Sequence, residues 1–326
     1  MLYKQVSSMS NNTHTISICD YTSENRCEWN QFIESSKNGT FLLKREYMDY
    51  HSDRFKDASI MVYKKNKLIG VLPGNTRDNV FYSHQGLTYG GLIMNNRITV
   101  EDVLEIFRLL NQRLKQEGIE KVVYKPIPYI YHRIPSQEDI YSLFRICNAR
   151  KIGCNISSTI SQNDKIKFNE SRKSGIRKAI ANGVRISISH DFASFWNILD
   201  TNLKNKYGVA PVHSLEEIEL LQSRFPTNIK LYLASVDDTP VAGTVLYLTR
   251  NVVHTQYISA SLQGKEIGAL DLLFDNIINQ QYTNYPWFDF GQSTEENGNI
   301  LNEHLIFQKE GFGGRGMCYD IYEYEL

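Results

Sequence analysis

Residues 252–278 read VVHTQYISASLQGKEIGALDLLFDNII, and this stretch decides the fold class. Its first nine residues are rich in β-branched and aromatic side chains, which predicts a strand. Gly264 and Gly268 mark a turn, and from Ile267 onward apolar residues recur with the helical period. A strand that passes through a glycine turn into an amphipathic helix predicts an α/β unit.

The flanking segments extend this unit on both sides. Residues 230–234 and 241–248 form a predicted hairpin that turns at Asp237-Asp238, just before the strand at 252. After the helix, PWFDFG from Pro286 predicts a further strand, and CYDIYEY from Cys318 predicts a closing one. Because hairpins alternate with a strand–helix–strand crossover, we expect a mixed sheet flanked by helices.

The first half of the chain repeats this order of elements. Residues 59–72 predict a hairpin around Lys65-Asn66-Lys67, and residues 100–114 predict a helix with Thr99 as N-cap and Gly118 as its stop. KVVYKP from Lys121 predicts the next strand. Matching elements lie about 165–175 positions apart, which indicates an internal repeat.

The repeat predicts two tandem α/β units that span residues 1–165 and 166–326. They join near residues 162–170, before a basic helix, SRKSGIRKAIANG, whose Ile176, Ala179 and Ile180 we expect to point inward. No Pro- or Ser-rich linker separates the units. We therefore expect the two units to pack closely and to leave a cleft between them.

Composition excludes several classes of protein. The 326 residues include 36 Lys plus Arg and 36 Asp plus Glu, so no net positive charge attracts a polyanion, and DNA is not an expected partner. The five cysteines show no CxxC spacing, and neither a metal site nor a disulfide framework is expected. Residues 1–15 lack the apolar core of a signal peptide, and no run approaches the roughly 20 apolar residues of a membrane span. We expect a cytoplasmic protein.

Familiar catalytic motifs are missing from the sequence. It contains no G-x-S-x-G elbow, no GxxxxGK[ST] loop, no H-E-x-x-H helix and no G-x-G-x-x-G turn after a strand. Serine hydrolases, P-loop enzymes, zinc peptidases and dinucleotide oxidoreductases therefore lack support.

Two motifs resemble those of GNAT (Gcn5-related N-acetyltransferase) acyltransferases of the Fem and CelD-like branch. Residues 265–269, KEIGA, resemble the [RQ]-x-x-G-x-[GA] turn that holds a pyrophosphate, although the leading residue is out of register, with Gln263 two positions early. Residues 287–314 read WFDFGQSTEENGNILNEHLIFQKEGFGG and resemble the end of Fem-like chains. In that stretch Asp289, Gly291 and Lys309 fall at the motif positions, and Gln308 separates Phe307 from Lys309.

The resemblance implies two GNAT-like domains and acyl transfer from acyl-coenzyme A by direct attack in a ternary complex. A backbone N–H of the strand at residues 257–259 would polarise the donor carbonyl, and a base would deprotonate an amine or hydroxyl acceptor. The implied catalytic residues are Lys309, Tyr257 and His84, and those implied to bind the donor are Ile258, Ser259, Gly264, Lys265, Gly268 and Ala269.

Polar loops in the first half suggest where an acceptor binds, namely SHQGLTYGG from Ser83 and YKPIPYIYHRIPSQED from Tyr124. Such an acceptor would be a small-molecule or nucleotide-linked sugar or peptide precursor of the cell envelope. The acceptor candidates are Tyr89, Lys125, Tyr131, His132, His213 and Asp289.

Structural roles compete with these assignments. The tyrosines could pack a domain interface, Lys309 could complement a helix dipole and Asp289 could cap a turn. His213 precedes a predicted capping box, Ser214 with Glu217. The basic helix is either a solvated surface or a contact for phosphate.

Two other functions stay open. The first is a Fem-type transferase with aminoacyl-tRNA as donor, against which the zero net charge and the lack of a long heptad arm weigh. The second is a binding module without catalysis, favoured by the degenerate phosphate-binding turn.

Overall fold

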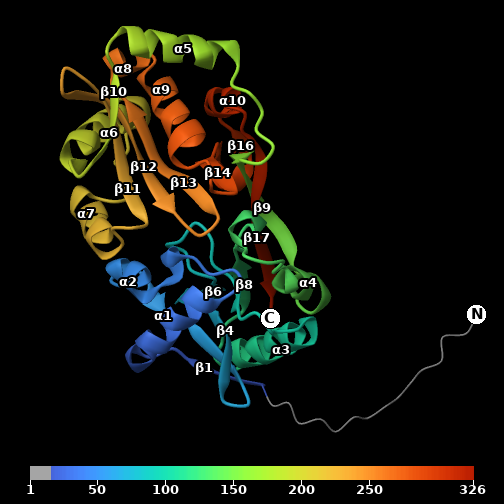
Figure 1. Ribbon diagram of the computed structural model, residues 1–326. Coiled ribbons are helices and arrows are strands. Elements are labelled where there is room, and N and C mark those ends of the chain that lie inside the picture. Colours follow the sequence, from blue (N-terminus) through green and yellow to red (C-terminus); the bar gives the residue numbers. More distant parts are fainter. Residues whose placement is uncertain (1–15) are drawn as a thin grey trace, which may run out of the picture.

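A mixed sheet runs through both halves of the chain in the computed structural model, which describes residues 16–326 (Figure 1). Within these residues the sheet has 11 strands, most of them antiparallel, and β13–β14 and β6–β8 are its parallel pairs. In spatial order the strands are β10 (Arg185–Ser189), β11 (Ile229–Val236), β12 (Thr239–Leu248), β13 (Val252–Ala260), β14 (Trp287–Gln292), β9 (Arg150–Ser161), β17 (Arg315–Glu325), β8 (Lys121–Tyr124), β6 (Val80–Tyr82), β5 (Asn75–Arg77) and β2 (Lys56–Asp57).

A smaller antiparallel sheet belongs to the first half, and both predicted hairpins are present. Lys65 and Asn66 at one turn and Asp237 and Asp238 at the other have positive φ, as a two-residue type I′ turn requires. The small sheet has the order β1 (Ile16–Asp20), β3 (Ile60–Lys64), β4 (Lys67–Leu72) and β7 (Ile93–Met94), and a separate ribbon pairs β15 (Thr294–Glu295) with β16 (Ile300–Leu301).

The helices begin and end largely where the sequence indicates. The Thr99 hydroxyl accepts from the Asp102 amide at 3.2 Å, and Gly118 follows the helix at φ 80°. The helices are α1 (Arg26–Ser35), α2 (Arg45–Met48), α3 (Val100–Gln116), α4 (Glu138–Arg145), α5 (Glu170–Ala181), α6 (Phe192–Tyr207), α7 (Leu215–Arg224), α8 (Leu262–Glu266), α9 (Ala269–Asn276) and α10 (Glu303–Gly311).

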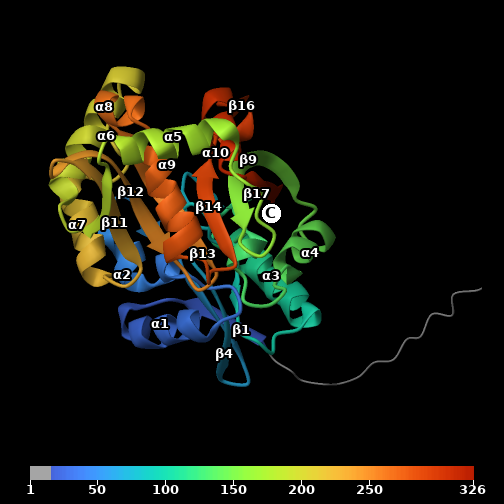
Figure 2. The same ribbon diagram turned by 45° about the horizontal axis from the view of Figure 1, so that its top comes forward.

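Two helix predictions need correction. The helix expected from Ile267 is broken, because Gly268 adopts a left-handed conformation between α8 and α9 and a π-helical turn follows at Ile277–Gln281. On α5, Ala179 is buried as expected, but Ile180 is 61% exposed. The reason is that α5 lies across the outer side of α9 and has no second layer over it (Figure 2).

One hydrophobic cluster contains residues of both halves. Phe41 of the first half contacts Phe225 of the second with ring centroids 5.3 Å apart, and the Tyr47 hydroxyl donates to that of Tyr247 at 3.3 Å. Arg54 pairs with Glu217 at 2.6 Å on the surface of the same contact. The close packing expected from the missing linker is therefore present.

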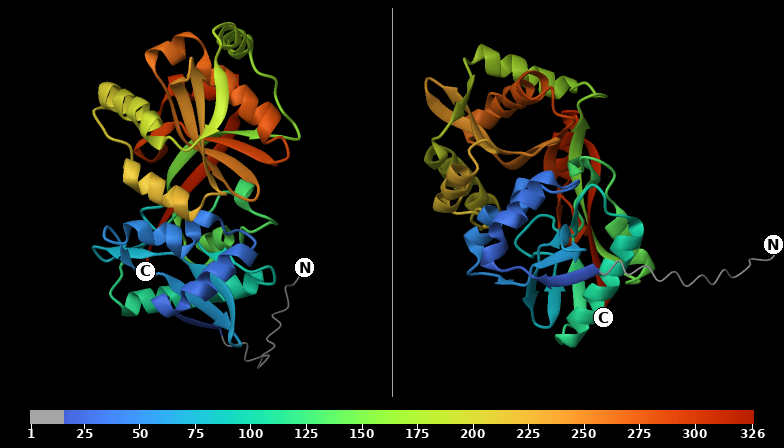
Figure 3. Two further views of the ribbon diagram at one scale, coloured as in Figure 1. Left: turned by 60° about the vertical axis from the view of Figure 1, so that its left-hand side comes forward. Right: turned by 60° about the horizontal axis from the view of Figure 1, so that its bottom comes forward.

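Strand β17 crosses between the halves. The expected join at residues 165/166 lies in the loop between β9 and α5, yet β17, the last strand, pairs with β9 along its first part and with β8 along its end. Figure 3 shows β9 (green) and β17 (red) side by side where the upper and lower halves meet. No helix among residues 16–326 is long and apolar enough to cross a membrane.

Candidate active site

The neighbouring strands β13 and β14 separate after a short paired segment. They pair in parallel only between Val252–His254 and Trp287–Asp289, and beyond this point they diverge. On its other edge β13 stays paired with β12 up to Ala260, with a register shift that leaves Gln256 as an extra residue. Backbone groups of β13 past His254 therefore face a gap instead of β14.

A cleft of about 490 Å³ opens beside this gap. Apolar side chains form much of its wall, and Lys265, Lys206 and Lys309 add positive charge. Its lining includes Leu199, Leu203, Ile258, Ser259, Phe290 and Leu305. An adjoining hollow of about 450 Å³ shares Ile258, Phe290 and Lys309 with it and continues to His254, Gln256 and Gly291.

His254 and Asp289 form a hydrogen-bonded pair at the last paired position of the two strands. His254 Nδ1 lies 2.8 Å from Asp289 Oδ2, and the carboxylate is fully buried. Burial acts to raise the pKa of Asp289, but the hydrogen bond and charge of His254, with donors from Ser157 and Tyr319, hold that pKa at about 2. Asp289 is therefore an anion in the folded protein.

Four hydroxyl groups surround the same carboxylate. Tyr319 donates to Oδ2 at 2.7 Å and Thr159 to Oδ1 at 2.9 Å, and Ser157 also donates to Oδ1. Tyr131 lies 3.5 Å from Oδ2 and 3.0 Å from the Tyr319 hydroxyl. An acceptor-only carboxylate with this many donors is rigidly held.

This arrangement sets the tautomer of His254. The ionised Asp289 can only accept a hydrogen bond, so Nδ1 of His254 must be the donor. A neutral His254 therefore carries its proton on Nδ1 and has its lone pair on Nε2. Its side chain is 14% exposed and lines the hollow. Gly291, at φ 74°, leaves room beside the ring, since a Cβ there would lie 3.2 Å from His254 Cε1. His254 can thus accept a proton inside the hollow.

Lys309 fixes the end of β14. Its Nζ donates to the carbonyls of Gly291 and Gln292, both at 2.8 Å, and to Ser293 Oγ at 2.9 Å. Burial lowers the pKa of Lys309 to about 8. All three N–H donors of the ammonium group are engaged in these hydrogen bonds. Lys309 would therefore act on a ligand mainly through the electrostatic attraction of its positive charge.

Tyr257 and His84 lie at two ends of one row of aromatic rings. The Tyr257 hydroxyl is 2.6 Å from His213 Nδ1, and the row continues through Tyr50 and His51 to His84. Burial raises the pKa of Tyr257 to about 12 and lowers that of His84 to about 3, so both are neutral near pH 7. Tyr257 lines the hollow, whereas His84 is buried and lines none of the cavities described here.

The residues expected to bind the donor separate into two sets. Ile258, Ser259 and Lys265 line the cleft. Gly264, Gly268 and Ala269 do not, which differs from the expectation. The glycines lie where backbones pack closely, because a Cβ on Gly268 would come within 2.5 Å of the Gly175 carbonyl of α5, and one on Gly264 within 2.2 Å of the Val241 carbonyl.

The acceptor candidates also separate. Tyr131 and Asp289 lie together beside His254, and Tyr89 contacts Tyr131 with ring centroids 4.8 Å apart. Lys125 and His132 instead bind loop carbonyls, Lys125 that of Leu87 at 2.5 Å and His132 that of Ile127 at 2.9 Å. Burial lowers the pKa of Lys125 to about 8 and that of His132 to about 4. His213 begins α7 through the expected capping box of Ser214 and Glu217.

A basic pocket of about 380 Å³ lies between the two halves. Lys37, Lys44, Arg133 and Arg250 line it, and Glu34 is its acidic lining residue. Lys37 is buried and paired with Glu138, and Lys44 is paired with Glu34 at 2.5 Å. The pocket therefore has an excess of positive charge.

A small space of about 10 Å³, which holds at most about one water molecule, lies between the basic pocket and the hollow. It shares Tyr131 and Thr249 with the pocket, and Thr88, His254 and Gln256 with the hollow. His254 therefore lines the hollow and this small space, and Tyr131 and Thr249 lie between the small space and the basic pocket.

Sequence reasoning missed His254 and the four basic residues of the pocket. One signal was present for His254: it is the third residue of its strand, as Asp289 is of the next, and a crossover through a helix makes the two strands parallel neighbours. Lys37 and Arg250 are 213 positions apart, and no local pattern connects them.

Comparisons with known proteins agree with the fold. Residues 167–297 match the family described as an acetyltransferase (GNAT) domain. No curated protein sequence matches the chain.

Several solved structures are similar over most of the chain. FemX has a TM-score of 0.69 at 10% identity, with 95% of this chain and 97% of FemX covered. L-PGS from Bacillus licheniformis has a TM-score of 0.60 at 12% identity, with 94% of this chain and 92% of L-PGS covered. The C-terminal domain of a putative lysylphosphatidylglycerol synthetase from Agrobacterium fabrum has a TM-score of 0.54 at 10% identity. The match covers 78% of this chain and 80% of that domain. These matches confirm the mixed α/β fold expected from the sequence.

Proposed function

We propose that this chain, an acyltransferase whose residues 167–297 form a GNAT domain, moves an acyl group from a phosphate-bearing carrier to an anionic amine or hydroxyl acceptor. The observation that supports this most is the position of the His254–Asp289 pair. It lies where β13 and β14 separate, and His254 lines both the hollow beside the apolar cleft and the small space next to the basic pocket. Donor and acceptor would enter from opposite sides and meet at His254.

The cleft suits the acyl end of a donor. Its apolar wall would accommodate the acyl chain, and Lys265, held by Asn202 at 3.2 Å, would face the phosphates of the carrier. Acyl-coenzyme A is our first candidate for this donor.

Aminoacyl-tRNA is the second candidate, and the packing of α5 favours it. GNAT enzymes that use coenzyme A hold its pyrophosphate at the N-terminus of the helix after the splayed strand. Here Gly175 of α5 packs directly against Gly268 at the start of α9, and the Gly264 amide already donates to Ser261 Oγ at 3.1 Å. A donor that binds without using this turn would not compete with the packing of α5 against Gly268.

The basic pocket suits an acceptor that carries phosphate. Arg133 and Arg250 can bind phosphate oxygens, whereas the charges of Lys37 and Lys44 are already paired with Glu138 and Glu34. The name of the lysylphosphatidylglycerol synthetase describes an aminoacyl group on a phosphate-bearing acceptor, which is the same class of chemistry. A nucleotide-linked sugar or peptide precursor of the cell envelope, present in the cytoplasm, is the acceptor we propose.

The chemistry is direct acyl transfer. The acceptor nitrogen or oxygen attacks the donor carbonyl, a new C–N or C–O bond forms, and the bond to the carrier sulfur or oxygen breaks. His254 Nε2 takes the proton of the attacking group, and Asp289 stabilises the resulting imidazolium. Backbone N–H groups of β13 that face the gap would stabilise the oxyanion. Tyr257, a neutral phenol that lines the hollow, is our candidate to protonate the leaving group, and the proton taken up by His254 would then return to the phenolate.

Thermal stability in the presence of ligands tests this proposal. Acyl-coenzyme A and aminoacyl-tRNA would be added separately, since a donor at about 100 times its Kd stabilises the fold by roughly 2.7 kcal/mol. Lys265→Glu should weaken the shift, and Lys67→Glu, at an exposed lysine of β4, should not. A shift with only one donor identifies the carrier. No shift with either would reject the proposal in favour of a binding module.

A further inference from the structure

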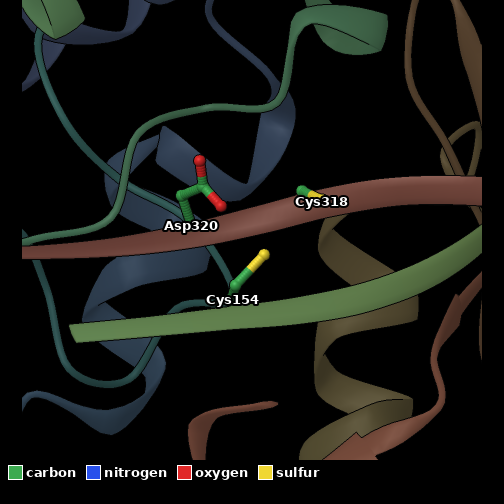
Figure 4. Close-up of side chains that lie close together, drawn as sticks. All are labelled: Cys154, Cys318 and Asp320. Carbon is green, nitrogen blue, oxygen red and sulfur yellow. The ribbon is translucent and has the colours of Figure 1, made fainter. Parts of the chain in front are cut away.

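Two cysteines and an aspartate converge on the sheet face that lies behind the candidate active site. Cys154 of β9 and Cys318 and Asp320 of β17 have ligand atoms that all lie within 4.8 Å of one another. Figure 4 shows these side chains on the two adjacent strands. None of the three takes part in the function proposed above.

Strand register explains why they meet although Cys154 and Cys318 are 164 positions apart in the sequence. Asp320 is opposite Cys154, and Cys318 is opposite Ile156. Because side chains alternate along a strand, Cys318 and Asp320 share one face. Tyr319, between them, points to the other face and donates to Asp289.

The geometry favours a metal ion over a disulfide. Cys154 and Cys318 are diagonal neighbours, a relation in which Cα atoms are typically about 7–8 Å apart, beyond the reach of an unstrained disulfide of at most roughly 7 Å. A metal ion needs no direct sulfur–sulfur bond and lies between its ligands. Two thiolates and one carboxylate are ligands that zinc accepts.

We propose that Cys154, Cys318 and Asp320 bind a divalent cation of the zinc class. Three protein ligands leave a fourth, tetrahedral position for water. The ion would enter from solvent, since Cys318 is exposed and Cys154 is half-buried. It would tie β9 to β17 on the face opposite Ser157, Thr159 and Tyr319, which hold Asp289.

Lys151 and Tyr322 already contact the carboxylate and have opposite effects on metal binding. Lys151 Nζ lies 2.9 Å from Asp320 Oδ1, so it competes with a cation for that oxygen. Its side chain is 46% exposed and can turn into water when a metal ion arrives. The Tyr322 hydroxyl donates to Oδ2 at 3.2 Å, a contact that would orient the carboxylate toward the ion.

Metal titration of the reduced, chelator-treated full-length protein tests the site. We expect one equivalent of Zn²⁺ to bind in competition with a chromophoric chelator, and Co²⁺ to give a thiolate-to-metal absorption band. Cys318→Ser and Asp320→Asn should abolish this binding. Cys27→Ser, at another exposed cysteine, should retain it.

Two further variants separate a built site from chance proximity. Lys151→Ala should bind the metal more tightly, and Tyr322→Phe about tenfold or more weakly. Equal binding by wild type and a folded Cys318→Ser variant would reject the site. A Cys154–Cys318 disulfide that forms in air, with no metal uptake by the reduced protein, would also reject it and identify a redox pair.

Discussion

At the scale of single residues, His254 and Asp289 owe their contact to the parallel pairing of β13 with β14. The carboxylate is inaccessible and positions the imidazole, whereas the imidazole faces the hollow. Lys309 holds the strand end next to them through three hydrogen bonds. The roles assigned to Lys309, Tyr257 and His84 from the sequence remain predictions.

His254→Gln should lower kcat by about 10²–10⁴-fold, because it removes the proposed proton acceptor. The donor KM should change little, since the cleft itself stays intact. Steady-state kinetics would measure both, with His190→Gln as the control, because His190 is an exposed histidine outside the site. Full activity in a folded His254→Gln variant would exclude this role.

Asp289→Asn should change how stability depends on pH. A folded-state pKa of about 2 lies below the usual value of 3.8, so the ionised carboxylate stabilises the fold above about pH 4. That contribution, on the order of 2 kcal/mol, is lost as the pH falls toward 2. Urea unfolding at several pH values should show a shallower decline for Asp289→Asn. An unchanged decline would mean that other carboxylates dominate acid unfolding.

At the scale of elements, the crossing of α5 over α9 decides what the turn after β13 can do. Gly175 and Gly268 let α5 and the start of α9 approach so closely that a Cβ on Gly268 would lie 2.5 Å from the Gly175 carbonyl oxygen (Figure 2). Arg172 of α5 also pairs with Asp271 in the first turn of α9 at 2.6 Å. The turn that resembles a pyrophosphate site is thus a packing contact in this chain.

Gly268→Ala should destabilise the protein more than Gly183→Ala. Both glycines have positive φ, 75° and 70°, so both substitutions introduce similar backbone strain. Only at position 268 does the new Cβ meet neighbouring backbone, and such overpacking typically costs about 1–3 kcal/mol. Chemical denaturation of both variants measures the difference. Equal losses would mean that α5 moves away at little cost.

At the scale of the whole molecule, each half has buried apolar residues of its own, and a further shared cluster joins the two halves. Phe41, Tyr47 and Trp29 pack in the same cluster as Phe225 and Tyr247. Strand β17 supplies a partner to both β8 and β9 of the first half. The halves should therefore unfold together.

A fragment of residues 1–165 should lack a cooperative thermal transition, because β8 and β9 would lose β17 and the shared core would be open. Co-expression with residues 166–326 should restore one transition, which calorimetry can record. A fragment that melts cooperatively by itself would show that the first half is an independent domain.

The sequence by itself determined the local elements of this protein. Turn residues such as Asn66 and Asp238, the Thr99 cap and the periods of apolar residues act over a few positions, so the hairpins and α3 could be predicted closely. The order of elements, together with motifs around Asp289 and Lys309, was enough to indicate the fold class. Matches to known domains and structures confirm that class.

Only the tertiary structure decided which distant residues meet. Strand register brings His254 to Asp289 and Cys154 to Cys318, the packing of the halves gathers Lys37 and Arg250, and α5 closes the turn at Gly268. These contacts depend on how the strands pair and how the helices pack over the sheet. The free energy of both comes from burying surfaces that are far apart along the chain, and no local pattern encodes it.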